Sequence, residues 1–117
     1  MSNKKEPYYY KCKLINVVDG DTINVMVDLG FKVFKQVTLR LARINTPELH
    51  TPEGKKVKLH LIAFLSKDNT QITFSSVKVD RYGRSIAEVY INNKGTPAFL
   101  LSDYLVTNQI AMYEKYN

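Results

Sequence analysis

The sequence predicts one mainly β domain, a five-stranded barrel with two helices in the order βββαββα. The chain has 117 residues, of which 44% are hydrophobic, enough for one core but not for two domains. Runs of β-branched and aromatic residues alternate with short turn signals, which is typical of strands. Two other segments have helical spacing, and no apolar run approaches the roughly 20 residues of a membrane helix.

The first three strands are predicted at 9–18, 22–28 and 32–44. Asp-Gly-Asp at 19–21 and Asp-Leu-Gly at 28–30 are typical of the turns between them. The third strand is the longest, and alternation places three apolar side chains on one of its faces: Val37, Leu39 and Leu41.

The first helix is predicted to begin at Thr51 and to continue to about Ser66. Thr51-Pro52-Glu53 combines an N-cap, a proline in the first turn and an acidic residue near the positive end of the helix dipole. Apolar residues then recur at helical spacing, with lysines on the opposite side.

The second half of the chain predicts a hairpin and another helix. Strands at 71–79 and 85–92 flank an Arg-Tyr-Gly turn. Asn-Asn-Lys-Gly follows this pair, and Thr96-Pro97 repeats the cap-and-proline pattern, so a second helix is expected from there to about Asn108.

Five strands with a helix between the third and fourth are typical of the Greek-key barrel called the OB-fold, whose surface commonly binds oligonucleotides. We expect a flexible segment at 1–7 and a single domain at 8–117. The fold carries many unrelated functions, so its function must be argued from individual residues.

Charge and cysteine content narrow the function classes. Seventeen Lys and Arg against 11 Asp and Glu give a net charge of +6, which favours a polyanionic partner, nucleic acid first. One cysteine excludes an intrachain disulfide and a cysteine-based zinc cage. The N-terminus lacks the apolar core of a signal peptide, so we expect a cytoplasmic protein unless a leader has been removed. We also expect a monomer with no membrane partner.

Three short motifs contain the side chains that could perform chemistry. Asp19 and Asp21 project to one side if the backbone is extended, which suits a hard cation, although an Asx-type turn would explain them as well. The segment 40–48 places Arg40 at a strand end, followed by Asn-Thr-Pro-Glu. The turn at 80–84, Asp-Arg-Tyr-Gly-Arg, bears two cations and an aromatic ring. Taken singly, the last two motifs could be a solvated strand end and a solvated turn.

Together, the motifs supply the parts that phosphodiester cleavage needs: a cation site, a carboxylate to orient or deprotonate water, and guanidinium donors for the phosphate oxygens. Their order along a βββαββα chain resembles the staphylococcal nuclease (thermonuclease) family. The resemblance covers about residues 11–113.

The resemblance implies a Ca²⁺ site. Asp21 would supply its carboxylate and Thr46 its backbone carbonyl, with Asp19 nearby and acting through water. Asn45 stands where the best-studied members have a second calcium-binding aspartate. An amide oxygen still ligates calcium, but one charge is lost, so weaker metal binding is expected.

The resemblance also implies a reaction. Glu48 matches the residue that orients or activates the attacking water, and Arg40 and Arg84 match the two arginines that clamp the scissile phosphate. Water would attack phosphorus in line and leave a 3′-phosphate. The substrates would be DNA, single-stranded or double-stranded, and RNA.

Further residues are candidates for substrate binding. Tyr82 matches a family tyrosine beside the nucleotide phosphates, and Tyr113 or Tyr116 could supply a second, although packing of a terminal segment would explain either. Lys55 and Lys56 could attract the nucleic-acid backbone or could simply form a solvated helix face.

Two departures from the family pattern leave an alternative open. No counterpart of the family's third, C-terminal helix is expected after the second helix, and its loss should reduce stability more than chemistry. Because Asn45 weakens the expected metal site, the chain could instead be a non-catalytic nucleic-acid-binding module on the same barrel. A protein-interaction domain is a third possibility that no residue specifically favours.

Overall fold

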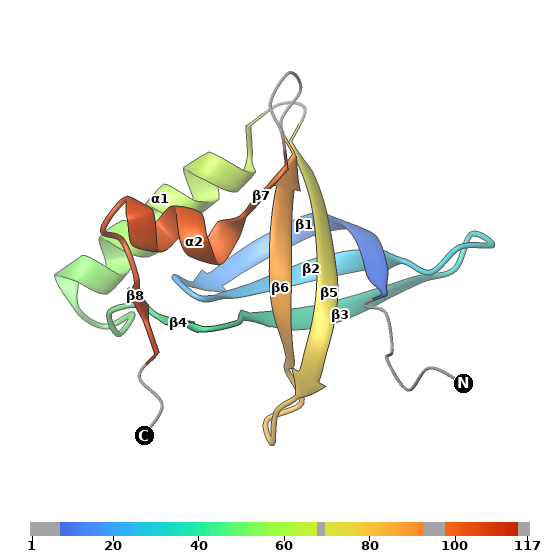
Figure 1. Ribbon diagram of the computed structural model, residues 1–117, viewed down its shortest axis with the longest axis horizontal. Coiled ribbons are helices and arrows are strands. Elements are labelled where there is room, and N and C mark those ends of the chain that lie inside the picture. Colours follow the sequence, from blue (N-terminus) through green and yellow to red (C-terminus); the bar gives the residue numbers. More distant parts are fainter. Residues whose placement is uncertain (1–7, 68–69, 93–97, 115–117) are drawn as a thin grey trace, which may run out of the picture.

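The computed structural model describes residues 8–67, 70–92 and 98–114, and it has the predicted five-stranded barrel (Figure 1). Residues 1–7, for which a flexible segment is expected, lie outside the described part. The elements in chain order are β1 (Tyr9–Asp19), β2 (Thr22–Asp28), β3 (Phe34–Leu41), β4 (Ile44–Asn45), α1 (Pro52–Leu65), β5 (Gln71–Val79), β6 (Ser85–Asn92), β7 (Phe99–Leu100), α2 (Leu101–Thr107) and β8 (Met112–Tyr113).

One parallel contact closes the barrel. The order β3-β2-β1-β5-β6 is antiparallel throughout, and β3 then pairs with β6 in parallel, Arg40 opposite Ile86. Two-residue strands lie outside this circle, with β7 on the edge of β6 and β8 paired with β4. The mainly β, OB-type prediction is therefore confirmed.

Alternating side chains of the five long strands fill the core. Ile23, Leu39, Val89 and Ile91 are completely buried. Cys12, the only cysteine, lies at the junction of β1 and β5, where its Sγ contacts the Ile72 carbonyl oxygen at 3.7 Å. Burial raises the pKa of this thiol to about 12.

Helix α1 confirms the first predicted helix. The Thr51 side chain accepts a hydrogen bond from Gly54 N at 3.0 Å, Pro52 occupies the first turn, and Ser66 is the C-cap. Figure 1 shows α1 and α2 beside one another at one end of the barrel, and the Phe64 and Tyr104 rings join them at 4.3 Å. In the described part of the chain, no helix is long and apolar enough to cross a membrane.

The predicted third strand is wrong at both ends. It begins at Phe34 because Phe31 and Lys32 adopt positive φ angles of 53° and 61°. It ends at Leu41 because Arg43 adopts a φ of 70°, which interrupts the ladder before β4 begins.

The predicted start of the second helix is also wrong. Helix α2 begins at Leu101, since Phe99 and Leu100 first pair with β6. The Leu100 N-cap has no side-chain hydrogen bond, and the Thr96-Pro97 signal lies outside the described residues. The predicted end is within one residue, because Asn108 is the C-cap.

At Gly54, helix α1 packs directly against the loop that precedes it. A Cβ atom added there would lie 1.9 Å from the Glu48 carbonyl oxygen and 2.9 Å from that of Pro47. Both obstacles are backbone atoms, so neither can rotate away. The absence of a side chain at this position therefore fixes how closely the 47–48 backbone approaches the helix.

We predict that Gly54→Ala destabilises the protein by about 1–3 kcal/mol, the range typical of overpacking. Alanine is normally favoured over glycine inside a helix by about 1 kcal/mol, so the sign of the effect is diagnostic. Chemical denaturation measures it. Leu59→Ala, an exposed change on the same helix, should stay within about 0.5 kcal/mol of wild type. A Gly54→Ala variant as stable as wild type would contradict the close approach.

Candidate functional site

One cavity of about 240 Å³ collects the predicted metal and catalytic residues. It lies where the β1–β2 turn, the end of β3, the loop after β4 and the β5–β6 turn meet. Its lining includes every residue of the two sets: Asp19, Asp21, Arg40, Asn45, Thr46, Glu48 and Arg84. The structure therefore brings these side chains together in one place.

Asp21 is a largely enclosed carboxylate of the cavity, with its side chain 15% exposed. Its Oδ1 accepts a hydrogen bond from Thr22 Oγ1 at 3.1 Å, and its Oδ2 accepts one from Thr46 Oγ1 at 3.2 Å. Its backbone N–H donates to Asp19 Oδ1 at 3.0 Å, which bends the turn. Gly20 permits this fold, since a Cβ there would lie 2.5 Å from Val57 and 2.7 Å from Thr46 Oγ1.

The electrostatics at Asp21 favour a cation. Burial raises the pKa of the Asp21 carboxyl group, the neighbouring Asp19 raises it further, and the Arg40 guanidinium only partly opposes this. The ionised form is thus poorly compensated by the described protein groups. A positive ion placed between the two carboxylates would remove that imbalance.

Arg40 is held in place by oxygen atoms from two directions. Its guanidinium donates to the carbonyl oxygens of Leu41 and Ile44, and its Nη2 donates to Asn45 Oδ1 at 2.9 Å. Carboxylate oxygens of Asp21 and Glu114 lie 3.5 and 3.4 Å from the same nitrogen. The Arg40 side chain, 13% exposed, is therefore oriented before any substrate binds.

Arg84 is positioned by an acid of its own turn. Asp80 Oδ2 accepts from Arg84 Nε at 2.8 Å, and its Oδ1 accepts from the backbone N–H groups of Tyr82 and Arg84, each at 2.9 Å. Desolvation would raise the pKa of Asp80, but these hydrogen bonds and the Arg84 charge hold it below its usual value. Asp80 belongs to the Asp-Arg-Tyr-Gly-Arg turn at 80–84. Its position four residues before Arg84 was the sequence feature that could have identified it as the partner of Arg84.

Glu48 is the exposed acid of the cavity. It lies in the loop between β4 and α1, and its backbone carbonyl accepts from the Thr51 N–H at 3.0 Å and from Thr51 Oγ1 at 2.6 Å. The helix cap and the Gly54 contact thus fix the backbone from which the Glu48 carboxylate projects.

The substrate-binding candidates that the structure describes do not line this cavity. Tyr82 is 69% exposed at the tip of the β5–β6 turn, with the Arg81 and Arg84 guanidinium groups 5.2 and 5.4 Å from its ring. Lys55 and Lys56 are exposed on α1 and do not line the cavity. Tyr82, Lys55 and Lys56 all face solvent, and their contacts with nucleic acid stay predictions.

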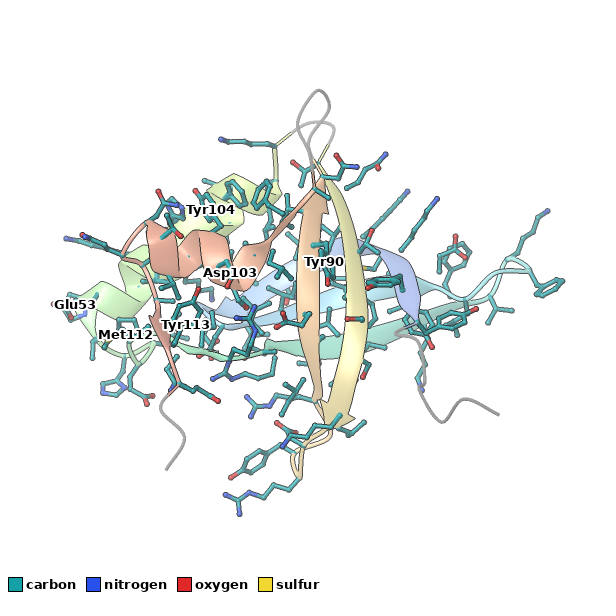
Figure 2. The ribbon with its side chains drawn as sticks, viewed as in Figure 1. Glu53, Tyr90, Asp103, Tyr104, Met112 and Tyr113 are labelled. Carbon is teal, nitrogen blue, oxygen red and sulfur yellow. The ribbon has the colours of Figure 1, made fainter. Side chains whose placement is uncertain are left out.

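Tyr113 has a partner inside the protein. Its hydroxyl donates to Asp103 Oδ1 at 2.8 Å, and Figure 2 shows the two side chains together beside α2. It does not line the 240 Å³ cavity. The other candidate, Tyr116, lies outside the described residues.

Arg43 was the main residue that the sequence interpretation missed. Its guanidinium pairs with Glu88 at 2.8 Å and with Asp103 at 3.1 Å, and these carboxylates raise its pKa despite partial desolvation. The backbone carbonyl of Arg43 accepts from Glu114 N at 2.8 Å. Arg43 therefore connects the turn before β4 to β6, α2 and the chain after β8, partners that no local pattern identifies.

A second, larger groove adjoins the cavity. It has a volume of about 650 Å³ and shares Arg40 and Arg84 with the cavity. Basic and acidic side chains both line it, among them Lys78, Arg43 and Glu114.

Comparison with known proteins identifies the family of the chain. The family model described as "Staphylococcal nuclease homologue" matches residues 38–117. The thermonuclease of Staphylococcus hyicus is 32% identical over 100 residues, covering 80% of this chain and 54% of that protein. Protein ParB of Escherichia coli is 29% identical over 80 residues, and an uncharacterized endonuclease of Haemophilus influenzae is 32% identical over 79; each match covers 68% of this chain and 41% of the relative.

The chain spans about half the length of these curated relatives. The family match nevertheless extends over most of the chain, from within β3 to the last residue, and takes in Arg40, Glu48 and Arg84. The chain therefore belongs to the family of staphylococcal nuclease homologues.

Proposed function

We propose that the protein is a calcium-dependent nuclease that hydrolyses phosphodiester bonds of DNA or RNA. One observation carries the proposal: a single cavity is lined by two arginines, an enclosed carboxylate and an exposed glutamate. Relatives named thermonuclease and endonuclease support the same reaction class.

The donor atoms at the cavity suit Ca²⁺. They are all oxygens, the ligand type that this hard cation prefers. In the described part of the chain, no group of three or more His, Cys, Asp or Glu side chains could hold a metal, so neutral oxygens must complete the shell. Asp21 would provide its carboxylate, with the Asn45 amide and the Thr46 carbonyl as neutral ligands. The bound ion would neutralise phosphate charge and stabilise the charge that develops at phosphorus.

The side chains of the cavity divide the remaining work. Glu48 hydrogen-bonds the attacking water, orients it in line with the 5′ oxygen and accepts its proton. The bond between phosphorus and the 5′ oxygen breaks, the phosphate stays on the 3′ oxygen, and the released 5′ oxygen takes up a proton from solvent. Arg40 and Arg84 donate to the non-bridging phosphate oxygens and stabilise the transition state most, because charge on these oxygens grows as water adds to phosphorus. Asp80 positions Arg84 without touching the substrate.

One contact favours the alternative, a nucleic-acid-binding module without catalysis. Asn45 Oδ1 accepts a hydrogen bond from Arg40 Nη2, so the oxygen needed by the metal is already engaged. To bind a metal, the Asn45 amide must either rotate away from Arg40 or share its oxygen between Arg40 and the ion. The charged groups of the cavity would still bind phosphate without it.

We predict that Glu48→Gln lowers cleavage of single-stranded DNA in millimolar Ca²⁺ by roughly 100- to 10,000-fold, the usual contribution of a general base. Arg84→Lys should lower it roughly 100- to 1,000-fold, because lysine cannot keep the paired donor geometry. Rates of oligonucleotide cleavage measure both effects.

Neighbouring residues provide the matched controls. Glu53→Gln and Arg81→Lys make the same chemical changes outside the cavity and should cleave at nearly the wild-type rate. Cleavage by Glu48→Gln at the wild-type rate would remove Glu48 from the mechanism. A wild-type protein that binds DNA but never cleaves it, with or without chelator, would establish the binding module instead.

We predict opposite effects of two substitutions on calcium affinity. Asn45→Asp should tighten Ca²⁺ binding, because a carboxylate replaces an amide dipole, and Asp21→Asn should weaken it. Calorimetric titration with Ca²⁺ in the presence of a nucleotide measures both. Asn16→Asp and Asp28→Asn, which make the same changes away from the cavity, should leave the affinity unchanged. Unchanged affinity in both cavity variants would mean that the ion is bound elsewhere.

We predict that Asp21→Asn also stabilises the metal-free protein. Because burial and Asp19 raise the folded-state pKa of Asp21, ionisation costs stability as the pH rises from the ordinary aspartate pKa of about 3.9 through the folded value. The variant should therefore unfold at a higher temperature than wild type at pH 7 in chelator, and the difference should vanish below about pH 4. A lower unfolding temperature at pH 7 would contradict this balance of charges.

A further inference from the structure

The hairpin between β2 and β3 presents apolar side chains to solvent. It extends beyond the barrel, at the opposite end of these strands from the cavity (Figure 1). Phe31 is fully exposed at its tip, and three further apolar residues are about half exposed: Leu29, Val33 and Phe34. None of them belongs to the core cluster.

The tip has a defined, strained conformation. Gly30, Phe31 and Lys32 all have positive φ angles, which are costly for the two non-glycine residues. Two backbone hydrogen bonds between Leu29, Gly30 and Val33 hold the turn, at 2.8 and 2.9 Å. The Asp28 carboxylate accepts from Gly30 N at 2.8 Å. The turn therefore holds the Phe31 ring outward at an energetic cost that core packing does not explain.

Lysines surround the hairpin. Lys32 is exposed at its tip, and Lys35 is exposed on the face of β3 opposite to Phe34. Lys11 and Lys13 of β1 line a hollow of about 370 Å³ that Phe34 also lines. One acid, Asp28, lines the same hollow. Aromatic rings together with lysines complement an unpaired nucleic-acid strand, which offers base faces for stacking and phosphates for the cations.

A continuous sheet face connects this surface to the cavity. Phe34 and Arg40 lie on the same face of β3, because they are six positions apart and side chains alternate between the two faces of a strand. Between them, Thr38 Oγ1 donates to Asn24 Oδ1 at 2.6 Å, and Asn24 Nδ2 donates to Asn16 Oδ1 at 2.9 Å. At about 3.3 Å for each residue, the two ends lie about 20 Å apart. A nucleic-acid strand bound at Arg40 could reach the hairpin by crossing these neutral polar side chains. The distance is within the span of the roughly 4–16 nucleotides that one OB-fold typically binds.

We propose that the β2–β3 hairpin and the hollow at its base form a second contact for the nucleic acid, which binds an unpaired segment of the strand about 20 Å from the cleaved bond. Phe31 and Phe34 stack on bases, while Lys32, Lys11 and Lys13 contact phosphates. This rests on the proposed function for the identity of the partner, but it does not require cleavage.

The first test compares two oligonucleotide lengths in chelator, where no cleavage occurs. Phe31→Ala/Phe34→Ala should bind a fluorescein-labelled 12-nucleotide single strand at least about tenfold more weakly than wild type, since each stacked base contributes about that much. Binding of a dinucleotide should be unchanged. Lys11→Gln/Lys13→Gln should lower the slope of log affinity against log salt by about one for each lysine. Leu59→Ala and Lys67→Gln, exposed changes elsewhere, are the controls.

The second test uses the absence of tryptophan from the sequence. Phe31→Trp would carry a single tryptophan reporter at the hairpin tip. Stacking on a base should quench its fluorescence when the 12-nucleotide strand binds, but not when the dinucleotide binds. Binding of the longer strand without any change in tryptophan fluorescence would overturn the stacking contact.

Other outcomes separate this inference from the proposed function. Wild-type affinity of Phe31→Ala/Phe34→Ala for the 12-nucleotide strand overturns the hairpin contact, even if the protein is an active nuclease. Loss of that affinity in a protein that never cleaves DNA supports the contact and overturns the nuclease. Hairpin-dependent binding to vesicles containing phosphatidylserine, with unchanged oligonucleotide binding, assigns the surface to a membrane and overturns the inference.

Discussion

The parallel pairing of β3 with β6 is the contact on which the site depends. It places Arg40 opposite Ile86, two residues beyond Arg84, so two guanidinium groups from distant parts of the sequence line one cavity. The antiparallel pairing of Thr22 with Arg40 brings the acidic β1–β2 turn to the same edge. Each pairing is set by apolar side chains on the inner face, such as Leu39 and Leu41. Barrel closure and assembly of the site are therefore the same event.

The parts predicted from sequence were those with a local cause. Strand alternation predicted the five barrel strands, and the Thr51 cap predicted α1, because side chains near in sequence decide both. The third strand and the second helix were misjudged for the opposite reason. Arg43 breaks the strand while pairing with Glu88 and Asp103, and Leu100 delays the helix while pairing with β6. Such partners become neighbours only after folding.

The same distinction between local and tertiary causes applies to the candidate site. The structure brings the residues of the three motifs into one cavity, but the motifs gave no indication of how their charges are balanced. Each guanidinium is already paired with an acid: Arg40 lies near Asp21 and Glu114, and Arg84 near Asp80. A phosphate must therefore compete with carboxylates for both arginines. This competition preserves the orientation of each arginine at some cost in affinity, and only the tertiary structure reveals it.

The position of Cys12 allows opening of the barrel to be followed by chemical labelling of its thiol. Its thiol bridges β1 and β5 along a pairing that joins residues 9–12 to 72–75, shorter than the other antiparallel pairings between barrel strands. Burial suppresses the thiolate, which is the form that reacts with alkylating reagents. Labelling of the native protein must therefore wait until these strands separate. With a reagent that reacts slowly compared with reclosing, the labelling rate is proportional to the population of the opened state, and it gives the free energy of that separation without any engineered probe.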